Sequence, residues 1–99
     1  MPLVMQANGP YMAPQVACDH CGKLIIHASD GNYQWSDDTI AAGATAPLYF
    51  THKECCDAFE QARGGYWSAI DLEALPFYLV KNLQTSWRAA EAKSRWMSG

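Results

Sequence analysis

The sequence predicts a small α+β protein, with a finger over residues 16–65 that a bound metal ion is expected to hold together, and a helical extension over residues 66–99. Two observations place the finger: a Cys/Cys pair and a His/Cys pair stand 30 residues apart, and strand-forming residues lie between them. A third observation, an apolar stripe with helical spacing near the C-terminus, indicates the extension. With 99 residues and 49% hydrophobic content, the chain is expected to fold as one unit.

Residues 1–15, "MPLVMQANGPYMAPQ", are expected to form a flexible N-terminal arm. This stretch has neither a basic start nor an apolar run of the length found in secretory signals. No later stretch approaches the roughly 20 apolar residues that span a bilayer. We therefore expect a cytoplasmic protein with no membrane contact, and in that compartment four cysteines favour metal binding over disulfides.

A β-hairpin is predicted in the middle of the finger. Residues 23–28, "KLIIHA", are rich in strand-forming side chains. Asp30 and Gly31 are a hairpin-turn signal, and residues 33–35, "YQW", supply a return strand. Residues 36–47 are small and polar, so they are predicted to be a loop.

A short strand and a helix complete the finger. Residues 48–51, "LYFT", read as a strand that runs directly into the helix. Thr51 and Glu54 have the spacing of a capping box, which predicts that the helix begins at this point. The glycine pair at 64–65 is expected to end it.

The extension is predicted to contain one last helix over residues 76–96. Residues 66–75 are expected to be a connection or a short helical turn, and Pro76 suits the first turn of a helix. The apolar stripe of this helix is expected to form core, with a groove for a partner as the alternative. The stripe consists of Leu79, Val80, Leu83, Trp87 and Ala90.

The chemical signal in the sequence is the spacing C-x2-C-x30-H-x2-C, formed by Cys18, Cys21, His52 and Cys55. A tight turn around the first pair lets both thiolates point at one ion. His52 and Cys55 are three residues apart at a helix start, so their side chains face the same point. Four nitrogen and sulfur ligands suit tetrahedral Zn²⁺, whereas thiolates argue against Mg²⁺ and Ca²⁺.

The order of these elements resembles a treble-clef zinc finger. The spacing is similar to that of the zinc fingers of poly(ADP-ribose) polymerases, with "CDHCGKLI" at the knuckle and Tyr49-Phe50 before "HKEC". It resembles LIM-type fingers more loosely, because their gap is shorter. The resemblance covers residues 16–63 and implies the same four zinc ligands. DNA-break binding is not carried over, since residues 18–63 hold three basic against seven acidic side chains.

Three alternatives concern the cysteines. Cys56 lies four residues after His52 and is the alternative fourth ligand, although the two-residue gap favours Cys55. A redox-active pair is the rival interpretation for Cys18 and Cys21, but that motif is expected at a strand-to-helix turn of a βαβ unit. An enzyme is not expected, because four protein ligands leave no open position on the metal and no catalytic motif is present.

The net charge of −3 is unevenly distributed. Residues 1–75 hold three basic against nine acidic residues, whereas residues 76–99 hold four basic residues against Glu91. The acidic part disfavours nucleic acid, and the basic end keeps a local contact open. The candidate nucleic-acid contacts are Lys81, Arg88, Lys93 and Arg95.

These features predict a small zinc-binding protein that acts as a protein-interaction or regulatory module. The aromatic residues of the C-terminal half would supply its binding surface, because Trp and Tyr are enriched at binding hot spots, and a homodimer is one expected form. A nucleic-acid-binding finger that uses the basic helix is the first alternative. A redox or metal-handling protein is the second. The aromatic residues are Tyr66, Trp67, Phe77, Tyr78, Trp87 and Trp96.

Overall fold

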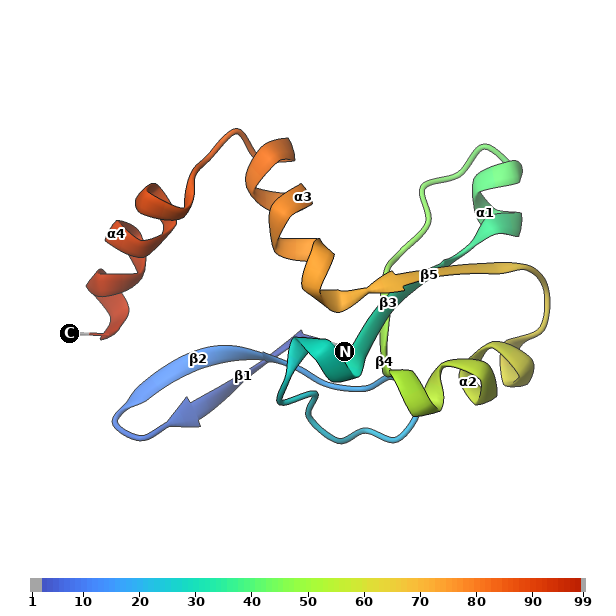
Figure 1. The fold of residues 1–99 in the computed structure, drawn as a ribbon, viewed down its shortest axis with the longest axis horizontal. Coiled ribbons are helices and arrows are strands. Elements are labelled where there is room, and N and C mark those ends of the chain that lie inside the picture. Colours follow the sequence, from blue (N-terminus) through green and yellow to red (C-terminus); the bar gives the residue numbers. More distant parts are fainter. Residues whose placement is uncertain (1–2, 99) are drawn as a thin grey trace.

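The computed structural model describes the backbone of residues 3–98 and, in that range, all side chains except those of residues 8, 11 and 95–98. It shows a small α+β chain with a β-hairpin, a three-stranded sheet and several short helices (Figure 1). The strands are β1 (Leu3–Asn8), β2 (Tyr11–Val16), β3 (Gly31–Ser36), β4 (Tyr49–His52) and β5 (Trp67–Asp71). The helices are α1 (Asp37–Ala41), α2 (Cys56–Arg63), α3 (Leu75–Asn82) and α4 (Trp87–Ser98), and the 3-10 turns are η1 (Ala28–Asp30), η2 (Lys53–Cys55) and η3 (Leu72–Ala74).

The N-terminal segment is a β-hairpin, which corrects the expectation of a flexible arm over residues 1–15. Strands β1 and β2 pair antiparallel from Leu3 opposite Val16 to Asn8 opposite Tyr11. Gly9 has a φ of 65°, which is the conformation that a two-residue hairpin turn requires at its first central position. The turn signal in "NGPY" was therefore present in the sequence, but the Pro and Gln residues around it concealed the strands.

A three-stranded antiparallel sheet in the order β4-β3-β5 forms the centre of the molecule. The predicted hairpin between residues 23–28 and 33–35 is wrong, because β3 pairs with β4 and β5 instead. Residues 23–28 contribute a single bridge, between Leu24 and Ala17. Ile25 is buried in the core while Ile26 is exposed, so this run packs against the sheet without joining it.

Three further differences concern the flanks of the sheet. The predicted loop over residues 36–47 contains α1, which Ser36 caps by accepting the backbone N–H of Thr39 at 3.3 Å. The predicted connection over residues 66–75 contains β5. The capping box is wrong, because Thr51 lies buried in β4 and donates its hydroxyl to Gln34 Oε1 at 2.5 Å. Helix α2 begins only after the turn η2, and it ends at Gly64 as predicted.

The hydrophobic core lies on one face of the sheet. It comprises Cys18, Ile25, Tyr33, Phe50 and Leu72, with Val16, Trp35, Cys55 and Leu75 packed against it. Helix α2 covers the opposite face, where the rings of Tyr49, Phe59 and Trp67 have centroids 5.3 to 5.7 Å apart. Cys18 is part of the core and Cys55 packs against it, so two cysteines of the predicted metal site lie in the same core as the sheet. We refer to residues 17–74, which contain the five buried residues of this core, as the body.

Residues 75–98 form a tail of two helices, not the single helix predicted over residues 76–96 (Figure 1). Pro76 lies in the first turn of α3 as predicted. The helix ends because Gln84 adopts a φ of 53°, and Ser86 then caps α4 by accepting the N–H of Ala89 at 3.0 Å. Among residues 3–98, no helix is both long enough and apolar enough to cross a membrane.

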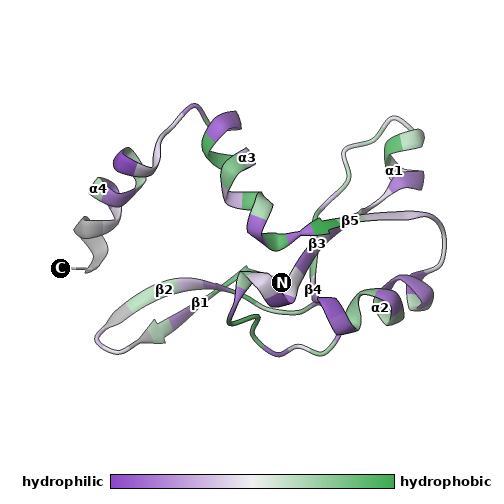
Figure 2. Cartoon of the chain, viewed as in Figure 1, coloured by the Kyte–Doolittle hydropathy of each residue, from purple (hydrophilic) through white to green (hydrophobic). Residues whose placement is uncertain are grey.

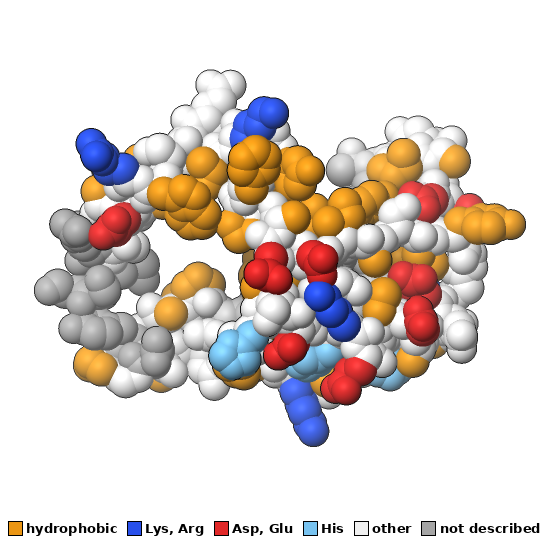
Figure 3. Space-filling view, viewed as in Figure 1, with side chains coloured by type: hydrophobic (Ala, Val, Ile, Leu, Met, Phe, Trp, Pro, Cys, Tyr) orange, Lys and Arg blue, Asp and Glu red, His pale blue; other side chains and the backbone are white. Residues whose placement is uncertain are grey.

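The tail projects from the body, so its apolar stripe does not form the expected core. The radius of gyration is 15.1 Å, whereas a compact domain of roughly 100 residues has about 13 Å. Leu79, Leu83 and Trp87 are all exposed. Figure 2 shows hydrophobic residues along α3, and Figure 3 shows an opening between the tail and the hairpin, although α4 does contact β2.

Candidate metal centre

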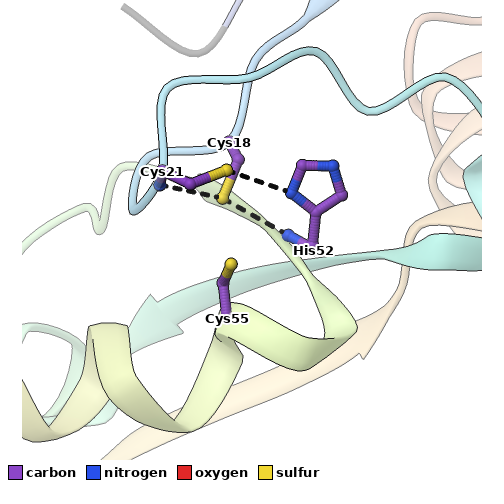
Figure 4. A group of neighbouring side chains, drawn as sticks. All are labelled: Cys18, Cys21, His52 and Cys55. Atoms are coloured by element: carbon purple, nitrogen blue, oxygen red, sulfur yellow. Dashed lines mark hydrogen bonds between the residues drawn. The ribbon is translucent and has the colours of Figure 1, made fainter.

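The four predicted ligands converge in the structure (Figure 4). One ligand atom from each of Cys18, Cys21, His52 and Cys55 lies within 4.8 Å of all the others. Sulfur atoms bound to one tetrahedral zinc ion lie about 3.8 Å apart, so a small contraction would bring the group to coordination distance. The group could therefore hold a metal ion.

Backbone hydrogen bonds hold Cys18 and Cys21 in a tight turn. The N–H of Cys18 donates to the carbonyl of Lys23 at 2.8 Å, and the N–H of Gly22 donates to the carbonyl of Cys18 at 2.9 Å. Gly22 has a φ of 78°, a conformation that residues with a Cβ rarely adopt. The glycine directly after the second cysteine therefore lets both sulfur atoms face the same side.

Asp19 connects this turn to β4, the strand that carries His52. Its backbone N–H donates to the carbonyl of Phe50 at 2.6 Å, and its carboxylate accepts the N–H of Phe50 at 2.8 Å. This reciprocal pair fixes the distance between the two halves of the site. Asp19 was not among the predicted site residues, although a hydrogen-bonding residue inside the C-x2-C turn was a signal for it.

The imidazole of His52 is oriented with one nitrogen toward the cysteines. Its Nδ1 lies 3.4 Å from Cys21 Sγ, and its Nε2 lies 3.2 Å from the carbonyl oxygen of Leu24. A carbonyl can only accept, so Nε2 carries the proton and Nδ1 keeps a free lone pair. This is the arrangement in which an outer hydrogen bond fixes the tautomer of a metal-binding histidine.

The sulfur of Cys18 is prepared to carry negative charge. Burial is the largest influence on its pKa and raises it, but hydrogen bonds outweigh that effect: one with the His52 side chain and three from the backbone N–H groups of Cys21, His52 and His20. The three N–H groups lie 3.4 to 3.5 Å from Sγ, and the pKa is lowered to about 6. The side chain is 2% exposed, so these donors replace the water that a thiolate would otherwise need.

The thiol of Cys55 is the group in the cluster that a bound cation would affect most. Burial raises its pKa most, the side chain and charge of Cys18 and Cys21 add to that, and the pKa reaches about 12. Cys55 therefore remains a thiol in the metal-free cluster at neutral pH. A divalent cation reverses this balance, because it favours the deprotonated form of every sulfur around it.

Cys56, the alternative fourth ligand, lies outside the cluster. It is buried, and its thiol donates to Glu60 Oε2 at 3.4 Å. The same carboxylate accepts the side-chain amide of Gln34 at 3.1 Å, while Gln34 also accepts the hydroxyl of Thr51. Cys56, Asp57 and Glu60 also lie close enough together to be grouped as potential ligands, but these hydrogen bonds account for the position of the carboxylate.

The surroundings of the centre differ between its two sides. Cys18 faces the core, whereas Cys21 is exposed. A pocket of about 440 Å³, lined by Asp30, His52, Lys53 and Glu54, lies beside the imidazole. The Lys53 ammonium pairs with the Asp71 carboxylate there at 2.5 Å.

The basic residues predicted as nucleic-acid contacts lie on the tail. Lys81 is on α3, and Arg88 and Lys93 are on α4, where all three are exposed. The side chain of Arg95 lies outside the described residues. Comparisons of the chain with protein-family models, with curated proteins and with solved structures found no match.

Proposed function

We propose that this protein is a protein-interaction module whose body is held together by one structural zinc ion, in a finger of the treble-clef type. The observation that carries the proposal is the convergence of three sulfur atoms and one imidazole nitrogen within 4.8 Å. Thiolates together with imidazole are the ligands that zinc prefers in structural sites. Calcium and magnesium prefer oxygen ligands, and none of the four side chains offers one.

A structural role fits this ligand set better than a catalytic role. Four protein ligands complete a tetrahedron, whereas catalytic zinc keeps a position for water or substrate. Cys18 lies in the core, so that side of the ion is closed. The backbone donors to its sulfur lower the basicity of that ligand but add no group that could activate a water molecule.

Zinc would link two segments that are distant in sequence. The C-x2-C turn precedes the sheet, and His52 and Cys55 stand where β4 passes into α2. In a domain of this size the buried core is small, so a metal crosslink contributes a large share of the folding free energy. The ion would therefore determine whether the body folds.

The interaction role rests on the tail. Its helices expose Phe77, Leu83 and Trp87, and exposed apolar surface of this kind marks sites of association. Aromatic residues contribute much of the binding energy at such sites. The body would thus be a scaffold, and the tail would be the surface that it presents.

Native mass spectrometry of the purified protein, with and without a chelator, tests the zinc site. We expect one zinc ion per chain, with loss of far-ultraviolet circular dichroism when the chelator removes it. Elemental analysis identifies the metal. A protein that purifies folded and without metal, or with a mass two protons lower than calculated, would contradict the proposal and indicate a disulfide instead.

A further inference from the structure

The apolar stripe of the tail begins in the core of the body and continues into solvent. Leu72, Leu75, Leu79 and Leu83 follow one another at intervals of three or four residues from η3 to the end of α3, as on one face of a helix, and Trp87 follows where α4 begins. Leu72 is 7% exposed and Leu75 packs against the core, but Leu79 is 46% and Leu83 is 71% exposed. The outer end of the stripe therefore lacks the apolar cover that its inner end has.

The tail is also basic. Lys81, Arg88 and Lys93 are exposed along α3 and α4, and the tail carries a net positive charge in a chain that is otherwise acidic. Hydrophobic side chains gather over α3 and the connection to α4 in Figure 3. A complementary surface would combine negative charge with some apolar area.

The body presents such a surface around the pocket beside the metal centre. Four exposed carboxylates surround Lys53, and we call them the acidic patch. They come from segments that meet, because η1 packs against η3 and Asp30 lines the same pocket as Glu54. Ile26 is exposed next to η1 and offers apolar area. The acidic patch consists of Asp30, Glu54, Asp71 and Glu73.

We propose that two copies of this chain pair reciprocally, so that the tail of each copy docks on the acidic patch of the other. This inference rests on the interaction role proposed above and names the partner. Because the basic tail and the acidic patch belong to the same chain, each of two copies can place its tail on the patch of the other. A two-fold dimer contains the contact twice, which closes the assembly.

The size of the tail agrees with this arrangement. Helices α3 and α4 have 8 and 12 residues, and a specific interface of standard size uses about 20–30 residues on each side. Pairing of tail against tail would instead bring Lys81, Arg88 and Lys93 of both copies together. Like charges at a contact oppose association, so the acidic patch is the favoured site.

Two charge-reversed variants test the proposal. In the tail variant, Arg88→Glu and Lys93→Glu make the tail acidic; in the patch variant, Asp30→Lys and Glu73→Lys make the patch basic. All four positions are exposed, so the body should fold in both variants. We expect a dimer for the unmodified protein and a monomer for each variant alone, measured by native mass spectrometry and analytical ultracentrifugation.

A mixture of the two variants should restore the dimer. In the mixed pair, one contact joins an acidic tail to a basic patch and the other is unmodified, so both are complementary. Leu83→Glu should weaken the dimer at least about tenfold. Ile40→Glu is the matched control, because Ile40 is 52% exposed on α1 in the body, and we expect no change.

Three outcomes would overturn the proposal: an unmodified protein that stays monomeric at high concentration, a mixture that stays monomeric, or a tail variant that dimerises more tightly. The last would indicate tail-to-tail pairing. The same spectra report zinc content, so the two proposals fail separately. A monomer with one zinc would refute the dimer alone, and a dimer without metal would refute the zinc site alone.

Discussion

The body buries apolar side chains in its core, whereas the tail exposes apolar side chains to solvent. In the body, Cys18 and Phe50 are buried together and the polar groups of Gln34 and Thr51 bond to each other. In the tail, Leu83 and Trp87 point their apolar surface at solvent. The difference teaches that residues able to bind a metal or form hydrogen bonds also specify which side chains they contact. An apolar stripe specifies only which face of a helix is apolar and leaves its partner open.

The largest expected effect is loss of the metal from the body. Cys18→Ser and Cys55→Ser should each remove the zinc and unfold the body, because structural zinc contributes about 10–16 kcal/mol in small zinc-binding peptides. Circular dichroism and zinc content measure this. Cys56→Ser, which changes the cysteine directly after Cys55, is the matched control, and this variant should keep its zinc. If Cys56→Ser lost zinc while Cys55→Ser kept it, the assignment of the fourth ligand would be wrong.

The second prediction compares an apolar side chain from each region. Phe50→Ala should destabilise the protein by about 3–5 kcal/mol, since it removes a buried ring from the core. Leu83→Ala should change the stability of the monomer by less than about 0.5 kcal/mol, because its side chain is exposed. Urea unfolding of the zinc-loaded protein at low concentration measures both. Equal losses would show that the tail packs on the body in solution.

The third prediction examines the polar contacts behind the metal centre. Gln34→Ala should cost about 1–3 kcal/mol, because it leaves the buried hydroxyl of Thr51 and the carboxylate of Glu60 without this partner. Gln61→Ala is the control, since Gln61 is exposed on α2, and Ala is favoured there. Thermal unfolding followed by circular dichroism distinguishes the two. A Gln34→Ala variant as stable as the control would mean that the network contributes no stability.

The sequence allowed the Cys/His cluster to be predicted but not the sheet that supports it. Ligand spacing and type follow from coordination chemistry, so Cys18, Cys21 and His52 could be placed together without knowing the strand order. Strand β5 could not be found in this way, because "WSAID" lacks the alternation of apolar and polar residues that indicates a strand, and it joins a sheet only through pairing with β3. Its assignment depends on a partner that is distant in sequence.

The tail illustrates the same limit for helices. Its period and the place of Pro76 were readable, so helix was predicted correctly for most of residues 76–96. The break between α3 and α4 could not be predicted. It occurs at Gln84, which is the one non-glycine residue with positive φ in the part of the chain that the structure describes. Glutamine is not a residue that signals this conformation. Nor does the period of an apolar stripe indicate whether the same chain or another chain covers it.

The last prediction separates the two regions by solution conditions. In the metal-free chain the pKa of Cys55 is raised to about 12, so at neutral pH zinc must displace its proton. Zinc affinity should therefore fall by about tenfold per pH unit for each proton displaced as the pH is lowered from about 8 to about 6. Competition with a coloured chelator at several pH values measures this. An affinity that does not change with pH would show that the sulfur atoms bind no metal.

Folding without zinc is expected to be unfavourable, and the free energy of that folding should become less unfavourable as the pH rises over the same range. The pKa of Cys18 is lowered from 9.0 to about 6, so its contribution is complete above about pH 9 and is lost as the pH falls through about 6. The raised pKa of Cys55 acts at higher pH, where its contribution to stability is lost as the pH rises from 9.0 to about 12.

Added salt should instead weaken the contact of the exposed tail, because ions screen surface charges but penetrate little to a buried sulfur cluster. Zinc retention that follows pH, with dimer dissociation that follows salt, would establish that the two regions act by separate physical means.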